Sequence, residues 1–137
     1  MFYRSISVFL FVIVLAACTE PPYKNINNEQ LKSMLEQGVP IYDIRRQDEW
    51  HQTGMIEGSI PLTFIAKEAR VSPDFFPNFT RSMDKNSSVI LICRTGHRTR
   101  KLAAHLADNF GYTQIYNVRN GITEWIKEGN EVVRKRF

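Results

Sequence analysis

Apolar residues gather in four short runs that are separated by polar or helically spaced stretches. The runs are residues 39–44 (VPIYDI), 58–62 (GSIPL), 87–93 (SSVILIC) and 114–118 (QIYNV). The run at 87–93 is continuous rather than alternating, which is typical of a strand buried on both faces. All four segments are therefore predicted strands, and Pro61 places the second at an edge or end of a sheet.

The segments between these runs are predicted helices. In 27–38 the apolar residues share one face, Asn27 or Asn28 can cap the start, and Gly38 can end the helix. A helix is predicted from Thr99 to Phe110, with Gly111 past its end; four apolar residues form its inner face, namely Leu102, Ala103, Leu106 and Phe110. The remaining predicted helices are 45–52, 64–69, 75–83 and 121–129.

Strands that alternate with helices predict an α/β fold, with a parallel sheet covered by helices on both faces. A chain of 137 residues is long enough for one domain with a proper core and too short for two. Its apolar fraction of 43% and charged fraction of 23% are ordinary for a globular protein, which excludes a disordered chain.

The first 17 residues have the layout of an export signal. Arg4 is their only charge, and an apolar stretch over 6–15 precedes small residues. That stretch is shorter than the roughly 20 residues of a spanning helix. The sequence LAAC ending at Cys18 resembles the bacterial lipoprotein signal, which is cleaved before a cysteine that receives lipid. An ordinary signal peptide and an uncleaved anchor are the alternatives.

These features divide the chain into a signal peptide (1–17), a lipid-anchor site with a tether (18–22) and one domain (23–137). Thr19 follows the cysteine where some lipoproteins have Asp, and by resemblance this favours the periplasmic face of the outer membrane.

If Cys18 carries lipid, Cys93 is the only free thiol of the mature chain. Although export implies an oxidising compartment, Cys93 then has no disulfide partner within the chain. Cys93 is either an inert side chain of the core or a reactive group.

The net charge of +4 is unevenly distributed. Between Lys85 and Ala107 all charged residues are basic: Lys85, Arg94, Arg98, Arg100 and Lys101. This field favours a small anion as ligand, because nucleic acid would call for a longer basic stripe with interleaved aromatic residues. A solvated helix face is the alternative interpretation.

Cys93 lies where the buried strand ends and the next helix begins, the edge at which parallel sheets bind ligands. The backbone N–H groups of the intervening loop can form a cradle for an anion. This cradle, the helix dipole and the charges of Arg94 and Arg98 should favour the thiolate, which is the attacking form of cysteine. The alternative is an inert cysteine at a strand end.

The spacing in the loop separates two chemistries. Tyrosine phosphatases and their relatives place five residues between the cysteine and an arginine, but only four lie between Cys93 and Arg98. Ile92 also replaces the histidine that usually precedes the phosphatase cysteine. A tetrahedral phosphate needs the wider ring of amides, whereas a tighter loop has room for one transferred sulfur atom. The spacing favours sulfur transfer.

Three motifs in order resemble the rhodanese-like family over about residues 23–129. In the first, YDIRRQDEWHQTGMIEGSIPL, seven residues fall on matching positions: Asp43, Arg45, Glu49, Trp50, Gly54, Ile56 and Gly58. The segment CRTGHRT is similar to the family's six-residue active-site loop, and NGITEW resembles its Gly-Gly-x-x-x-Trp. Met55 replaces a usual histidine, Ser59 replaces an alanine, and Asn120 replaces the first of the two glycines; the changes at 55 and 120 put local packing in question.

The resemblance implies a five-stranded parallel sheet and a sulfurtransferase that carries sulfur as a persulfide on Cys93. The implied substrate-binding loop is Arg94, Thr95, Gly96, His97, Arg98 and Thr99. Asp43 and Arg45 are expected to support this loop by hydrogen bonds. Trp50 and Trp125 are expected in the core.

The resemblance also implies the partners. The expected donor is a small anion such as thiosulfate, and the acceptor is cyanide, a thiol or a sulfur-carrier protein. No metal is expected, because His51 and His105 are distant in sequence from His97 and a lipidated Cys18 leaves no second free cysteine. No cofactor is expected, because the protein itself carries the sulfur. A non-catalytic module that binds a sulfur carrier or another protein is the alternative.

Overall fold

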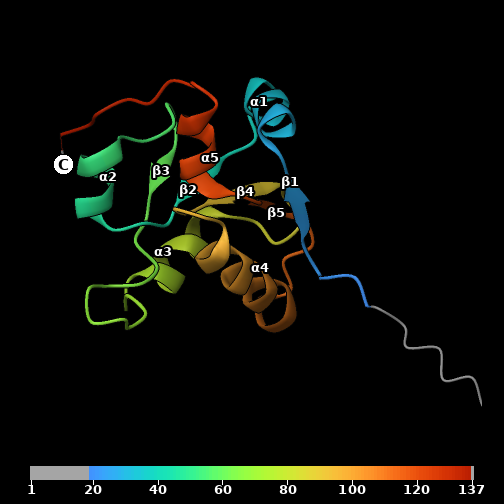
Figure 1. Cartoon of the computed structure of the whole chain (residues 1–137). Helices are drawn as coiled ribbons and strands as arrows, with labels where there is room; N and C mark the ends of the chain where they lie inside the picture. The colour runs from blue at the N-terminus through green and yellow to red at the C-terminus, as the bar shows by residue number, and fades with distance from the viewer. Residues whose placement is uncertain (1–18, 137) are drawn as a thin grey trace, which may run out of the picture.

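The computed structural model describes residues 19–136 (Figure 1). The predicted signal peptide and the lipidation site Cys18 lie outside the described residues. Within residues 19–136, no helix is both long enough and apolar enough to cross a bilayer. The elements in chain order are β1 (Lys24–Ile26), α1 (Asn28–Glu36), β2 (Ile41–Asp43), α2 (Gln47–Thr53), β3 (Ile60–Pro61), α3 (Phe75–Ser82), β4 (Val89–Ile92), α4 (His97–Phe110), β5 (Ile115–Val118) and α5 (Gly121–Lys127).

The strands form one five-stranded sheet in the order β1-β5-β4-β2-β3. Every pair in it is parallel, which confirms the predicted α/β class. The apolar strand β4 lies at the centre between β5 and β2, and all four of its residues are buried. The continuous apolar run thus marks the strand that has neighbours on both edges and both faces.

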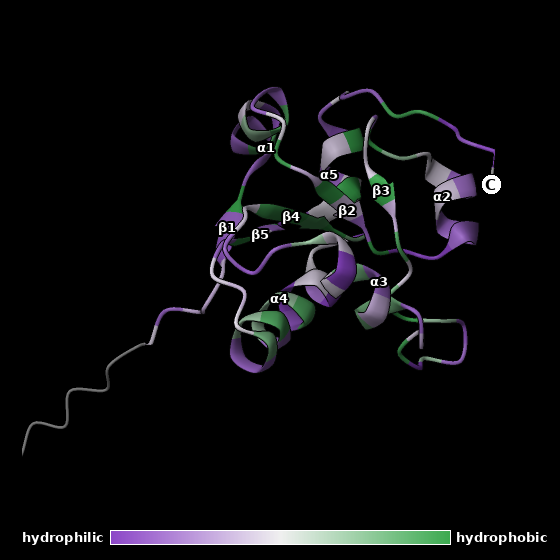
Figure 2. Cartoon of the chain, turned by 180° about the vertical axis from the view of Figure 1, so that it is seen from behind, coloured by the Kyte–Doolittle hydropathy of each residue, from purple (hydrophilic) through white to green (hydrophobic). Residues whose placement is uncertain are grey.

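Helices cover both faces of the sheet (Figures 1 and 2). Helices α3 and α4 pack on one face, and their buried apolar side chains are Phe75, Phe79, Leu102, Ala103 and Leu106. Helices α1 and α5 pack on the other face through Leu31, Ile122 and Trp125. Trp50 and Trp125 are each 7% exposed, which confirms their predicted place in the core. Met55 is fully buried as well, so the core accommodates this departure from the family pattern.

The ends of the helices follow local sequence signals. The Asn27 side chain accepts a hydrogen bond from the Gln30 backbone, and the Gln30 side chain accepts one from the Asn27 backbone, a capping box that confirms the predicted start of α1. Helix α4 ends at Gly111, whose left-handed conformation (φ 76°) suits glycine. It begins at His97, two residues before the predicted start at Thr99.

Two predictions of secondary structure are wrong. Residues 64–69 form no helix: Ile65 instead pairs with Val71 in an antiparallel bridge, and Ala69 between them has a positive φ of 57°. A six-residue helix has too few internal hydrogen bonds to form without tertiary support, and here Phe64 packs edge-on against Phe75 instead. Strand β1 (Lys24–Ile26) was also missed, because its three residues contain only one buried apolar side chain.

Candidate active site

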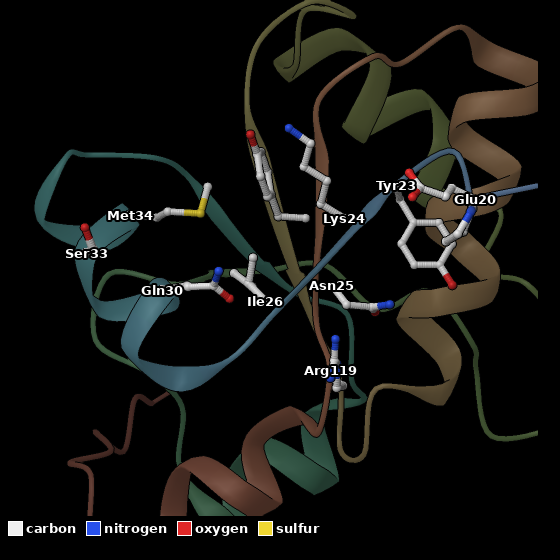
Figure 3. A pocket seen from close by; sticks show the side chains of 11 residues that line it. Glu20, Tyr23, Lys24, Asn25, Ile26, Gln30, Ser33, Met34 and Arg119 are labelled. Atoms are coloured by element: carbon white, nitrogen blue, oxygen red, sulfur yellow. The ribbon is translucent and has the colours of Figure 1, made fainter.

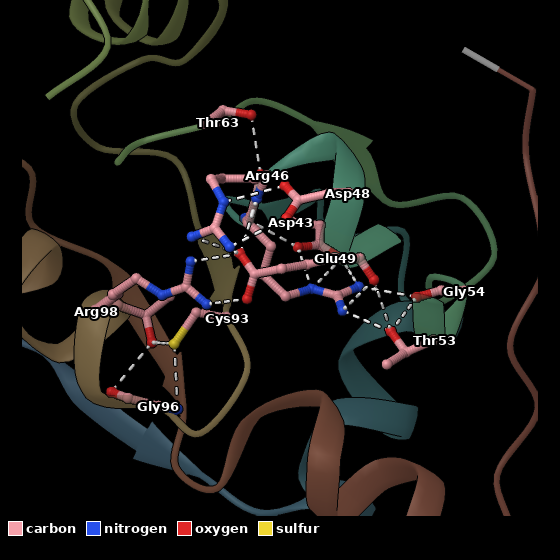
Figure 4. Close-up of polar contacts among 12 residues, drawn as sticks. Asp43, Arg46, Asp48, Glu49, Thr53, Gly54, Thr63, Cys93, Gly96 and Arg98 are labelled. Atoms are coloured by element: carbon pink, nitrogen blue, oxygen red, sulfur yellow. Dashed lines mark hydrogen bonds and ion pairs between the residues drawn. The ribbon is translucent and has the colours of Figure 1, made fainter. Parts of the chain in front are cut away.

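Cys93 follows β4 directly and is 1% exposed. The backbone N–H of Gly96 donates a hydrogen bond to its Sγ atom at 3.2 Å (Figure 4). Gly96 is the N-cap of α4 and has a φ of 86°. A Cβ atom at this position would lie 2.0 Å from the carbonyl oxygen of Arg119, so the turn that aims this N–H at the sulfur requires glycine.

The start of α5 holds the loop from the other side. The N–H groups of Ile122 and Thr123 donate to the carbonyl oxygens of Cys93 and Arg94 at 2.9 and 3.1 Å. Gly121 allows this approach, since a Cβ atom there would lie 2.4 Å from the Arg94 oxygen. The preceding Asn120 has a φ of −109°, which any residue adopts. The absence of the family's first glycine therefore costs the backbone nothing.

A chain of buried polar side chains begins at the sulfur. The Thr99 hydroxyl lies 3.3 Å from Cys93 Sγ and donates to Asn117 Oδ1 at 2.6 Å. Asn117 Nδ2 in turn donates to Asn25 Oδ1 at 2.8 Å. Thr99 and Asn117 are at most 1% exposed. Sequence reasoning named Thr99 but missed the two asparagines; an asparagine inside the run QIYNV was the available signal.

The guanidinium of Arg98 forms an ion pair with the Glu49 carboxylate, so its charge does not act on Cys93 alone. Two Arg98 N–H groups donate to the two Glu49 carboxylate oxygens at 2.6 and 2.8 Å. These bonds outweigh partial desolvation and raise the pKa of Arg98. Burial alone would raise the pKa of Glu49, but the bonds from Arg98 and from the Arg46 backbone, with the charges of both arginines, hold it below its ordinary value. Sequence reasoning matched Glu49 to the family but gave it no role in the site.

Asp43 and Arg45 form a fully buried ion pair, with 2.6 Å between a guanidinium nitrogen and a carboxylate oxygen. Other Arg45 N–H groups donate to Thr53 Oγ1 at 2.7 Å and to the Gly54 carbonyl at 2.8 Å. Among the described residues, no hydrogen bond joins either side chain directly to the loop. Their bonds fasten α2 to the end of β2, and α2 carries Glu49, which pairs with Arg98.

The rest of the predicted loop forms the outer rim. Arg94, Thr95 and His97 are exposed. With Arg98 and Glu49 they line a hollow of about 320 Å³ that Ile65 and Arg46 complete.

Two further hollows lie on the β1 side of the loop. One of about 430 Å³ touches Gly96 and His97, and a larger one of about 700 Å³ runs along β1 and α1 (Figure 3). Asn25 and Arg119 line both. Across residues 19–136, no group of three or more His, Cys, Asp or Glu side chains is placed to hold a metal ion.

Taken together, a parallel α/β sheet and a buried cysteine loop at the end of its central strand define the class of protein. Residues 27–128 match the family model of the rhodanese-like domain, and the chain belongs to that family. A rhodanese domain-containing protein of Drosophila melanogaster is 35% identical over 96 residues, which are 66% of this chain and 86% of the relative. A sulfurtransferase of Allochromatium vinosum is 30% identical over 110 residues, which are 79% of this chain and 92% of the relative. Among solved structures, a rhodanese-like domain protein of Staphylococcus aureus matches with a TM-score of 0.60 and 26% identity, covering 80% of this chain and 98% of that one.

Proposed function

We propose that this protein is a sulfurtransferase that carries sulfur as a persulfide on Cys93. The observation that carries the proposal is the buried Sγ atom at the end of β4, which accepts the Gly96 N–H at 3.2 Å. A preset donor of this kind stabilises negative charge on sulfur without reorganisation. The similarity to the sulfurtransferase of Allochromatium vinosum supports the same reaction class.

The proposed reaction has two displacement steps at sulfur. The Cys93 thiolate attacks the outer sulfur of a donor such as thiosulfate, the donor's S–S bond breaks, and sulfite leaves with the bonding electron pair. The persulfide on Cys93 is then attacked at its outer sulfur by cyanide or a thiolate. Its S–S bond breaks, the acceptor keeps the sulfur, and the Cys93 thiolate is restored. No electron donor and no cofactor takes part.

Arg94 is the proposed site of attraction for an anionic donor. It is exposed at the mouth of the hollow beside the loop, and among the described residues its side chain forms no ion pair. The charge of Arg98 is already balanced by Glu49. The two predicted substrate-binding arginines thus differ in role, with Arg94 drawing in the anion and Arg98 holding the loop.

The function is tested on residues 19–137 mixed with thiosulfate under non-reducing conditions. Intact mass spectrometry should show the gain of one sulfur atom on Cys93, and cyanide should remove it. The Cys93→Ser variant should gain nothing. If wild type gains no sulfur from thiosulfate, polysulfide or a low-molecular-weight persulfide while Cys93→Ser captures a protein partner, the domain is a binding module.

We also propose that the protein is exported and anchored by lipid on Cys18, on the periplasmic face of the outer membrane. The support is the sequence of residues 1–19 alone. Detergent phase separation of the expressed full-length chain should place wild type in the detergent phase, and intact mass spectrometry should show residues 1–17 removed and lipid mass added to Cys18. Cys18→Ser should show neither the cleavage nor the lipid mass. Wild type in the aqueous phase would contradict the lipid anchor.

A further inference from the structure

Four side chains form a hydrogen-bonded line from the sulfur of Cys93 to the edge of the sheet. Cys93 follows β4, Thr99 lies on α4, Asn117 on β5 and Asn25 on β1. The distances along the line are 3.3, 2.6 and 2.8 Å. The chemistry of each member limits which atom donates at each step, and this gives the line a direction.

The Thr99 hydroxyl has one hydrogen and three polar neighbours. Besides the sulfur, these are Asn117 Oδ1 at 2.6 Å and the Gly96 carbonyl oxygen at 3.2 Å, which both only accept. Because Asn117 Nδ2 is turned to Asn25, the Oδ1 atom faces Thr99 and needs its hydrogen. Thr99 therefore offers Cys93 a lone pair, and this arrangement suits a protonated thiol whose S–H donates to Thr99.

The thiolate and the persulfide need the opposite arrangement. In both states the Sγ atom bears no hydrogen, so a Thr99 lone pair turned toward it would be repelled. Turning the hydroxyl hydrogen to the sulfur would leave Asn117 Oδ1 buried without a donor, which is costly at a site that is 1% exposed.

Reversing both amides removes this conflict. If Asn117 and Asn25 each exchange the positions of their oxygen and nitrogen, Asn25 Nδ2 donates to Asn117 Oδ1, Asn117 Nδ2 donates to Thr99, and Thr99 donates to the sulfur. The oxygen and nitrogen of an amide are nearly equal in size, so the exchange changes the direction of the bonds and not the packing.

We propose that Asn117 and Asn25 are positioning residues that reverse the Thr99 hydroxyl when Cys93 changes between thiol and thiolate or persulfide. The inference deepens the proposed sulfur transfer and names the residues that adapt one site to its successive states. No proton passes along the amides; the thiol proton leaves to water, and the line then reverses by rotation.

The outer end of the line is open to solvent. Asn25 is half-buried and lines the hollow along β1, where Figure 3 shows its side chain beside Arg119. Water in that hollow can donate to or accept from Asn25 in either orientation, so the reversal leaves no unpaired group at this end.

The charge of Arg98 also acts on Cys93. The other charged or titratable groups around the loop are Glu49 on α2, Asp43 and Arg45 at the end of β2, Arg94 and His97 on the rim, and Arg119 after β5. The test must therefore separate the effect of hydrogen-bond direction from that of charge.

The test follows the alkylation of Cys93 by iodoacetamide against pH in the full-length chain, read by peptide mass spectrometry. The midpoint of the profile reports thiolate formation. Thr99→Val removes the donor, so its midpoint should rise by about one pH unit, the size expected for one hydrogen bond to an ionised group. Thr99→Ser keeps the hydroxyl and should match wild type. An unchanged midpoint in Thr99→Val would overturn the proposal.

The decisive variant changes the far end of the line. Asn25→Asp can only accept, so it fixes Asn117 Oδ1 toward Thr99 and should raise the midpoint by about half a pH unit or more. The control places the same substitution in a broken line: in Thr99→Val the hydroxyl is gone, so adding Asn25→Asp should raise the midpoint no further, whereas an effect of its charge would persist. Asn25→Ala lets water occupy the outer end of the line, so the midpoint should change little. If Asn25→Asp raises the midpoint as much in Thr99→Val as in wild type, charge explains the effect and the proposal fails.

This experiment uses no sulfur donor. If no persulfide forms on Cys93, the proposed function fails, but the alkylation result remains valid. The two failures can therefore be told apart. The variant at position 25 lies at a half-buried site, and its folding is checked by thermal unfolding beside wild type.

Discussion

Glu49 and Arg98, separated by 49 positions in the chain, form a two-pronged ion pair with N–O distances of 2.6 and 2.8 Å. The pair joins α2 to the first turn of α4, next to the loop that follows Cys93. Glu49 is 6% exposed and also accepts the backbone N–H of Arg46, so it fixes two segments at once. Helix α2, which lies far earlier in the sequence, therefore helps to fix the position of the loop that follows Cys93.

Removing this carboxylate should loosen the loop. We expect Glu49→Gln to lower the free energy of unfolding by about 1–2 kcal/mol, because a neutral amide replaces a charge-assisted pair but can keep one hydrogen bond. Urea unfolding measures the change. Glu57→Gln, at an exposed position that forms no ion pair within residues 19–136, is the control and should lie within about 0.5 kcal/mol of wild type. Equal effects of the two substitutions would show that the pair does not stabilise the fold.

The contribution of Glu49 should depend on pH in a defined direction. Its pKa in the folded protein is held below the ordinary value of 4.5 by Arg98 and Arg46, although burial opposes this. A lowered folded pKa means that the stabilisation is fully present above the unfolded pKa and is lost as pH falls through the folded pKa. The difference in unfolding free energy between wild type and Glu49→Gln should be constant from about pH 8 to pH 6 and should shrink toward about pH 3. A difference that grows on acidification would contradict this assignment.

The turn at Gly96 should tolerate no side chain. Gly96→Ala places a Cβ atom 2.0 Å from a backbone oxygen that cannot move without shifting β5 and α5. We expect a loss of more than about 2 kcal/mol in unfolding free energy and a loss of Cys93 reactivity. Gly58→Ala has a similar positive φ of 76° but meets no atom within 4 Å. It should cost only about 1 kcal/mol and leave reactivity intact. Thermal unfolding and alkylation rates distinguish the two.

Arg94 should affect substrate capture and not folding. We expect Arg94→Ala to raise KM for an anionic donor several-fold at low salt with little change in stability, since the side chain is exposed and outside any ion pair of the described residues. The difference from wild type should decrease as salt screens the charge. Steady-state kinetics with thiosulfate measure it, with Arg81→Ala, on the exposed side of α3, as the control. A KM that is insensitive to Arg94 would assign donor attraction to other groups.

Local signals allowed much of the fold to be predicted. The apolar run of β4, the asparagine cap of α1 and Gly111 after α4 each depend on residues that are close in sequence, so their effects are visible there. The predicted helix at 64–69 fails because a short segment follows its surroundings: the Ile65–Val71 bridge and the packing of Phe64 determine its conformation.

By itself, the sequence determined the parallel α/β class, most of its helices and strands, and the place of Cys93 between a buried strand and a helix, since periodicity and turn chemistry act over a few residues. Only the tertiary structure decided which side chains meet at the sulfur. The pairing of β1 with β5 brings Asn25 to Asn117, 92 positions away, and the placement of α2 brings Glu49 to Arg98. Such contacts depend on strand order and helix placement, which are set by burial of the whole core and not by any local pattern.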